Sequence, residues 1–110
     1  MADGPQLEHG YTRIANTLLE GLLAYPFAGG ELRLVLGVIR LTYGWGQKAR
    51  LLRIKELAKL AGLHPRYARR LLKRLARDRI VERHPISRVR VVIGLNKEFS
   101  TWRLRQIPKH

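Results

Sequence analysis

Cysteine is absent from this sequence of 110 residues. A chain without cysteine has no disulfide framework and no thiolate metal site. Long hydrophobic runs are absent as well, because Arg33 and Arg40 interrupt the most apolar stretch and a membrane-spanning helix needs about 20 apolar residues. The N-terminus carries Asp3 and Glu8 and does not resemble a signal peptide. We therefore expect a protein of the cytoplasm or the nucleoid that has no membrane partner.

Acidic residues are scarce. The chain has 8 Asp and Glu against 22 Lys and Arg, so its formal net charge is +14. Such an excess on a small domain raises self-repulsion and indicates a polyanionic partner, for which nucleic acid is the best candidate. The acids are scattered singly, which does not fit a two-metal nuclease, and the four histidines show no paired ligand spacing. The sequence therefore predicts no enzyme, no catalytic residue, no metal and no cofactor.

A glycine pattern at residues 44–49 formally fits G-x-G-x-x-A. A dinucleotide site needs a strand before this pattern and a helix after it. Here a predicted helix precedes it, so we do not expect a nucleotide cofactor.

The length indicates one domain, which we place at residues 11–105 between a flexible tail at 1–10 and a second tail at 106–110. Helical spacing of apolar residues predicts helices at 12–25 and 31–43, with Gly29 and Gly30 breaking the chain between them. We expect one face of the second helix to be formed by Leu32, Val35, Leu36, Ile39 and Tyr43.

Two short helices follow, at 54–61 and 65–77. Gly62 suits the left-handed cap of the first, His64 caps the second, and Pro65 suits its first turn. Alternating apolar residues then predict strands at 80–84 and 89–93 around a turn at 85–88, and a short last strand at 101–104. The fold class predicted is mainly α with a small β-wing, a winged helix-turn-helix.

The helix at 65–77 is expected to be the recognition helix. An apolar stripe faces the core and leaves a basic surface outside, and residues 66–83 hold eight basic residues against two acids. The N-terminal half of such a helix reaches base edges in the major groove of double-stranded DNA. We assign base contacts to Arg66, Tyr67, Arg69 and Arg70, and phosphate contacts to Lys73 and Arg74. The alternative is a solvated basic face.

Four more basic residues are candidate DNA contacts. Arg88 and Arg90 lie at the wing, where they could reach the minor groove or phosphates, and Lys48 and Arg50 follow the second helix. An ordinary solvated hairpin and loop are the alternatives. Trp45 and Trp102 are expected in the core, and the alternative is that they are platforms on which bases stack.

A homodimer is also compatible with the sequence. The first helix carries more apolar residues than a three-helix core requires. The alternative is that this helix covers its own core.

Three blocks of the sequence resemble the N-terminal domain of replication protein O of lambda-like bacteriophages. They are Gly10-Tyr11-Thr12-Arg13-Ile14-Ala15-Asn16 with Leu18-Leu19-Glu20, Val38-Ile39-Arg40-Leu41-Thr42-Tyr43-Gly44-Trp45 with Lys48, and Gly94-Leu95-Asn96-Lys97 with Ser100-Thr101-Trp102. The blocks occur in the family's order, and the resemblance covers nearly the whole chain.

The resemblance implies a winged-helix domain that acts as a dimer in the bacterial host and binds repeated sites in a phage replication origin. It also implies contact with helicase-loading machinery, but only through a further C-terminal region that this chain lacks. Two alternatives stay open: a transcriptional regulator of the same fold, and a non-specific nucleoid protein or protein adaptor.

Overall fold

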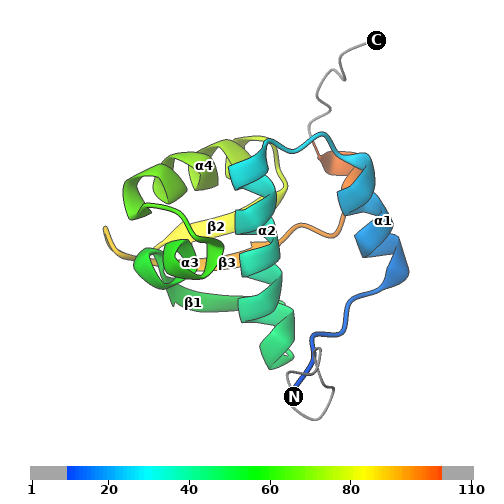
Figure 1. Cartoon of the computed structure of the whole chain (residues 1–110), viewed down its shortest axis with the longest axis horizontal. Helices are drawn as coiled ribbons and strands as arrows, with labels where there is room; N and C mark the ends of the chain where they lie inside the picture. The colour runs from blue at the N-terminus through cyan, green and yellow to red at the C-terminus, as the bar shows by residue number, and fades with distance from the viewer. Residues whose placement is uncertain (1–9, 103–110) are drawn as a thin grey trace, which may run out of the picture.

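The computed structural model describes residues 10–102. Within that range the helices are α1 (Asn16–Ala24), α2 (Gly29–Thr42), α3 (Ile54–Ala61) and α4 (Pro65–Arg77), with short 3-10 turns at Tyr43–Trp45 and Phe99–Thr101. The strands are β1 (Ala49–Arg53), β2 (Val81–Pro85) and β3 (Arg90–Leu95). Figure 1 shows α2 in the middle of the molecule, with α3, α4 and the sheet on one side and α1 on the other.

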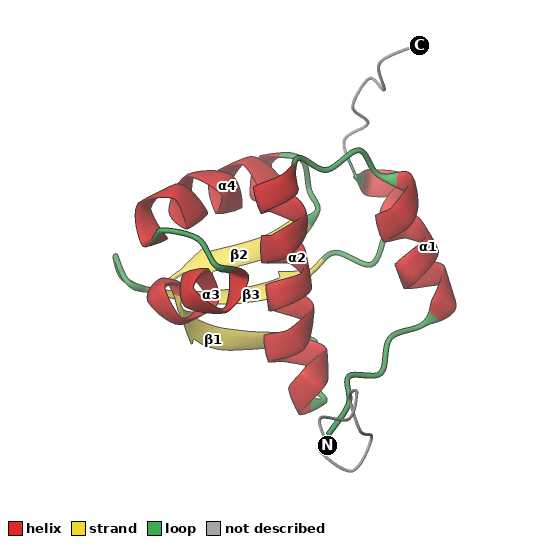
Figure 2. Cartoon of the chain, viewed as in Figure 1, coloured by secondary structure: helices red, strands yellow, loops and turns green. Residues whose placement is uncertain are grey.

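The three strands form one antiparallel sheet in the order β1-β3-β2. Leu52 pairs with Val91 across β1 and β3, and Val81 pairs with Leu95 across β2 and β3. These four side chains are buried. Helices α2, α3 and α4 pack against the sheet, and β2 and β3 form the wing after α4 (Figure 2). The predicted winged helix-turn-helix is therefore confirmed.

The helix-turn-helix matches the predicted bounds at both helices. Gly62 ends α3 with φ 71°, the left-handed conformation that glycine adopts without a steric penalty. The His64 Nδ1 atom accepts a hydrogen bond from the Arg66 backbone N–H at 3.2 Å, which confirms the predicted cap of α4. Pro65 is the first residue of α4, where its missing N–H costs nothing.

We expected the glycine pair at residues 29 and 30 to break the chain between two helices. Instead, the pair begins α2. Glu31 stabilises this start, because its Oε1 accepts from the Ala28 backbone N–H at 2.9 Å. A Cβ atom at Gly30 would lie 2.9 Å from Leu71 Cδ1. The missing side chain therefore lets α2 and α4 approach closely.

The predicted buried face of α2 is wrong in part. Leu32 and Leu36 are exposed, whereas the core contains Leu34, Val35, Val38 and Ile39. Apolar residues occur on almost every side of this helix, so periodicity alone could not select the buried side. The packing of α2 against α3, α4 and the sheet selects it.

The first helix is shorter than predicted. It begins at Asn16 instead of residue 12, because Ala15 has an extended backbone with ψ 147°. Ile14 therefore precedes the helix and packs against the core from an irregular segment. Leu18 and Leu22 are the buried residues of α1.

Strand β1 was not predicted, since Arg50 was assigned to a loop. Its sequence, ARLLR, does not alternate cleanly, and its pairing with β3 is what defines it. The other two strands lie within two residues of their predicted bounds.

The last predicted strand is wrong at its described residues. Thr101 ends a 3-10 turn and Trp102 follows in a bend. Residues 103 and 104 of that strand, and the tails at 1–9 and 106–110, lie outside the described residues.

The two tryptophans have different environments. Trp102 is buried, as predicted, and contacts Tyr25, Phe27 and Phe99 with ring centroids 5.5, 6.4 and 5.0 Å away. Trp45 was also expected in the core, but 62% of it is exposed. It lies in the 3-10 turn after α2, where the chain leaves the helix bundle before β1.

Candidate nucleic-acid interface

The outward side of α4 is a ridge of cations. Ala68, Leu71, Leu72 and Leu75 are buried against the rest of the domain. Side chains three and four residues apart share a helix face. The opposite face is therefore formed by Arg66, Arg70, Lys73 and Arg77, all exposed, which we call the α4 ridge.

Three of the predicted contacts lie beside this ridge. Tyr67 borders α2, since its ring lies 3.3 Å from the position of a Cβ atom on Gly30. Arg69, on the other flank of α4, is half-buried. The third, Arg74, is exposed and has its Nε 3.9 Å from Oε2 of the buried Glu31. The structure therefore places Arg66, Arg70 and Lys73 on the ridge, and Tyr67, Arg69 and Arg74 at its edges.

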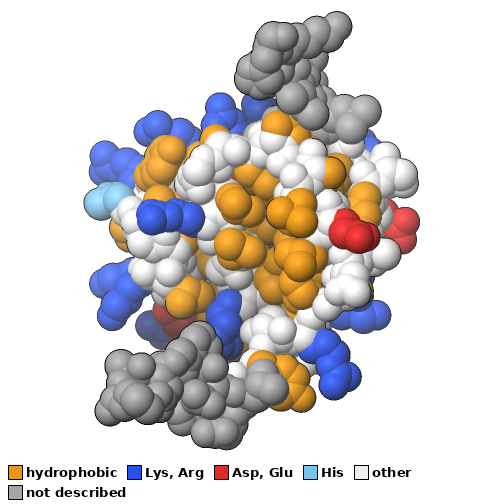
Figure 3. Space-filling view, turned by 45° about the vertical axis from the view of Figure 1, so that its right-hand side comes forward, with side chains coloured by type: hydrophobic (Ala, Val, Ile, Leu, Met, Phe, Trp, Pro, Cys, Tyr) orange, Lys and Arg blue, Asp and Glu red, His pale blue; other side chains and the backbone are white. Residues whose placement is uncertain are grey.

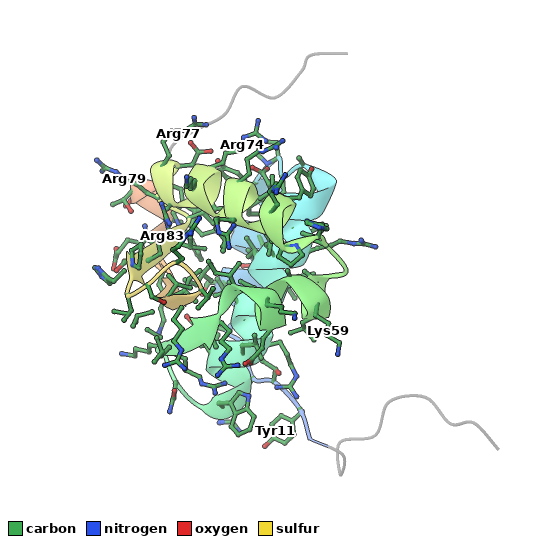
Figure 4. The ribbon with its side chains drawn as sticks, turned by 90° about the vertical axis from the view of Figure 1, so that its left-hand side faces the viewer. Tyr11, Lys59, Arg74, Arg77, Arg79 and Arg83 are labelled. Atoms are coloured by element: carbon green, nitrogen blue, oxygen red, sulfur yellow. The ribbon has the colours of Figure 1, made fainter. Side chains whose placement is uncertain are left out.

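Arg77 was not among the predicted contacts, although it shares the ridge. Figure 4 shows Arg74 and Arg77 at the upper edge of the molecule along α4, with Arg79 and Arg83 nearer the strands. The Arg77 Nε lies 3.6 Å from the Asp78 carboxylate, so part of its charge is compensated. The spacing of seven residues from Arg70 is the sequence signal that would have identified it.

The wing is joined to the helix-turn-helix by a backbone hydrogen bond. The N–H of Ile54, the first residue of α3, donates to the Val89 carbonyl at 3.0 Å. At the tip, the Ser87 hydroxyl accepts from the N–H groups of Val89 and Arg90 at 3.3 and 3.2 Å. These bonds fix the wing tip relative to α3.

Both predicted wing residues, Arg88 and Arg90, are exposed. Figure 1 shows the turn between β2 and β3 and the N-terminal end of α4 on the same side of the molecule. One duplex could therefore meet both elements.

Arg53 is a second residue that the sequence did not single out. It lies opposite Arg90 in the β1–β3 register, and both are exposed. Like charges directly opposite each other destabilise a sheet, unless an anion lies between them. A phosphate group has the charge to relieve this pair. Because β1 was not predicted, no sequence signal placed Arg53 beside the wing.

Lys48 and Arg50 are not brought to the same place as the α4 ridge. They follow the C-terminal end of α2 along the chain. Helix α4 lies near the N-terminal end of α2 (Figure 1). The Arg50 Nη1 donates to the Leu41 carbonyl at 2.8 Å, and its guanidinium lies 4.8 Å from the centroid of the Trp45 ring.

Other kinds of site find little support in residues 10–102. Within that range, no group of three or more His, Asp or Glu side chains could hold a metal ion. None of the helices described there is long and apolar enough to cross a bilayer.

A helix-turn-helix with an exposed cationic second helix and an arginine-bearing wing defines the class: this is a winged-helix domain of the DNA-binding kind. The family model for bacteriophage replication protein O matches residues 4–102. The chain belongs to that family, as its sequence blocks indicated.

Two curated relatives agree with this assignment. The chain is 30% identical to DNA replication protein gp18 of Salmonella phage P22 over 100 residues, which is 91% of the chain and 35% of the relative. It is 32% identical to Replication protein 15 of Enterobacteria phage phi80 over 102 residues, 93% of the chain and 32% of the relative. The chain thus spans about a third of the length of each. No solved structure matches it.

Proposed function

We propose that this domain binds repeated double-stranded DNA sites at a phage replication origin and so helps to initiate replication. The observation that carries the proposal is the α4 ridge, an uninterrupted row of exposed cations on the recognition helix of a chain from a phage replication family. Binding of this kind needs no cofactor and no catalytic group.

The geometry supports different roles for different side chains. Arg66 and Arg70 lie nearest the N-terminal half of α4, so we assign them to base edges, with Tyr67 and Arg69 at the borders of that contact. Lys73, Arg74 and Arg77 are assigned to phosphates farther along the helix. Arg88 and Arg90 are assigned to the adjoining minor groove or backbone, together with Arg53.

Binding to DNA in a selection experiment tests the proposal. The protein would be titrated against a library of duplex fragments from the phage genome, and the fragments retained would be sequenced. We expect a few fragments to bind at least 1,000-fold more tightly than random duplex, as specific winged-helix sites do. Binding of all duplexes within about threefold would contradict both sequence-specific hypotheses and favour the non-specific nucleoid role.

The location of the selected sites separates replication from transcription. An origin-binding domain should select several copies of one sequence clustered in an array. A transcriptional regulator should select single or paired sites at promoters. The family membership favours the array.

Self-association is part of the proposal. Leu19 and Leu23 of α1 are 44% and 78% exposed, and Leu32 and Leu36 of α2 are 38% and 48% exposed. Figure 3 shows hydrophobic side chains gathered over the side of the molecule where α1 and α2 lie. We propose that a second copy of the chain covers this face, so that two domains bind two sites together.

Light scattering with and without DNA tests the dimer. Leu23→Glu is expected to leave a monomer at concentrations where the unaltered protein is a dimer. Leu51→Glu, an exposed leucine on β1, is the matched control and should leave association unchanged. A monomer at all concentrations, also when bound to neighbouring sites, would contradict this part of the proposal.

The curated relatives extend well beyond the matched region. We therefore assign contact with helicase-loading machinery to regions of such proteins outside the match. The place of action that we propose is the bacterial cytoplasm, where phage DNA replicates.

A further inference from the structure

A second cationic surface lies at the end of α2 that is remote from α4. Arg40, Lys48 and Arg50 lie in or directly after that end of α2, and residues 32–55 contain no acid. Residues 10–19 contain one Arg and no acid. The α4 ridge does not account for this surface. Its charge favours a polyanion.

An exposed indole lies in the middle of this surface. Trp45 is 62% exposed, which is unusual for the largest apolar side chain. Two backbone hydrogen bonds close the turn that carries it: Gly46 N–H donates to the Tyr43 carbonyl and Gln47 N–H to the Thr42 carbonyl, each at 2.9 Å. The backbone of the turn therefore holds the ring in solvent. Little conformational entropy of this turn is lost when a ligand binds to the ring.

A guanidinium is held against the same ring. The Arg50 Cζ atom lies 4.8 Å from the Trp45 centroid, a cation–π distance. Its hydrogen bond to the Leu41 carbonyl keeps it there. An aromatic face beside a fixed cation suits a nucleotide, whose base stacks while its phosphate meets the charge.

A second exposed ring lies on the neighbouring segment. Tyr11 is 63% exposed. The next residue, Thr12, contacts the turn, because its Oγ1 lies 3.1 Å from the position of a Cβ atom on Gly44. Arg40 Nη1 lies 2.7 Å from that same position, so a further cation borders the turn. Figure 4 places Tyr11 at the lower edge of the molecule, at the opposite end from α4.

A pocket of about 450 Å³ adjoins the turn. Its lining includes Arg13, Tyr43, Gln47 and Lys48. The Tyr43 hydroxyl is buried and has no hydrogen-bond partner among the residues that the structure describes. Burial raises the pKa of Tyr43, which keeps the hydroxyl neutral.

We propose that the turn at Tyr43–Trp45, with Tyr11, Arg40, Lys48 and Arg50 around it, binds single-stranded DNA. Base faces are accessible to an indole only when the strand is unpaired, whereas a duplex presents its edges and phosphates. The site lies away from the α4 ridge. A domain bound to duplex DNA by α4 would therefore keep it free for a separated strand.

Titration of the full chain with fluorescein-labelled oligo(dT) of about 20 nucleotides tests the proposal by anisotropy. Trp45→Ala is expected to weaken binding about tenfold or more, since each stacked base contributes roughly 1–3 kcal/mol. Trp45→Phe, which keeps an aromatic face, should recover much of this loss. Leu51→Ala removes another exposed apolar side chain, from β1, and is the matched control, with no expected change.

A second pair of measurements separates this site from the α4 ridge. Arg70→Glu should abolish binding to selected duplex and leave the affinity for oligo(dT) within about twofold. Trp45→Ala should weaken binding to oligo(dT) about tenfold or more and leave the affinity for selected duplex within about twofold. Equal affinity of Trp45→Ala and the unaltered protein for oligo(dT) would overturn the proposal. Equal loss of oligo(dT) binding in Arg70→Glu would also overturn it, because one general basic surface would then bind both. An oligo(rU) of the same length, bound more tightly than oligo(dT), would overturn the assignment to DNA.

Discussion

At the scale of single residues, Arg70 lies in the middle of the α4 ridge and close to the N-terminal half of the helix. Arg70→Ala is expected to cost about 1–3 kcal/mol on the selected duplex and to relax specificity at one base, because a bidentate guanine contact would be lost. Competition titrations against single-base variants of the site measure both effects. Lys73→Ala is the control, and it should weaken binding uniformly on all sequences. The same uniform loss for Arg70→Ala would make Arg70 a phosphate contact.

Asn96 is a second residue with a strong expected effect, here on stability. Its Nδ2 donates to the Arg79 carbonyl at 2.6 Å and to the Thr101 hydroxyl at 2.8 Å, and its Oδ1 accepts from the Glu98 N–H at 3.1 Å. The residue is 8% exposed. Asn96→Ala would remove these bonds from the Arg79 carbonyl and the Glu98 N–H, and should lower the free energy of unfolding by about 2–3 kcal/mol.

Urea denaturation followed by circular dichroism measures this change. Ser100→Ala, at an exposed neighbouring position, should stay within about 0.5 kcal/mol of the unaltered protein. A similar small effect for Asn96→Ala would show that water replaces the lost bonds.

At the scale of elements, the turn between α3 and α4 decides how the recognition helix is presented. Gly62 has φ 71°, where a Cβ atom is strained although its nearest neighbour, Arg33 Nη1, would lie at an ordinary contact distance of 3.5 Å. Gly62→Ala should therefore lower the free energy of unfolding by about 1–2 kcal/mol. Thermal unfolding measures the loss as a fall in Tm.

Gly29→Ala is the matched control for this substitution. Gly29 begins α2, and a Cβ atom there would meet nothing within 4 Å. This change should be neutral or slightly stabilising, because alanine has the higher helix propensity. Equal destabilisation by both substitutions would contradict the assignment of strain to Gly62.

The elements also differ in how far their sequence predicts them. Local signals define the end of α3 and the start of α4, since Gly62, His64 and Pro65 mark these positions within the chain itself. Strand β1 has no such signal and exists because β3 supplies its hydrogen bonds. The start of α2 was misplaced because the need for glycine at residue 30 comes from Leu71, on another helix.

At the scale of the whole molecule, the net charge of +14 is distributed over at least two surfaces, the α4 ridge with the wing and the turn after α2. Binding to duplex DNA should fall steeply with salt, because cations that neutralise phosphates release counterions. With about 5–7 phosphates contacted by each domain, the slope of log K against log salt is expected to be roughly −4 to −6. Anisotropy titrations over a range of salt concentrations measure it, and a flat response would contradict an electrostatic interface.

The sequence by itself determined the class of the protein. The charge, the glycine and proline at the helix-turn-helix and the apolar stripe of α4 act locally, and local chemistry can be read along the chain. The blocks that resemble replication protein O likewise belong to the sequence, and the match over residues 4–102 agrees with them.

Only the tertiary structure decided which side chains share a surface. It separated Arg50 from α4, brought Arg53 beside Arg90, and placed Trp45 in solvent instead of the core. The physical reason is that exposure depends on which elements pack against each other. Residue spacing along one helix fixes its faces but does not say which of them another helix or a sheet will cover.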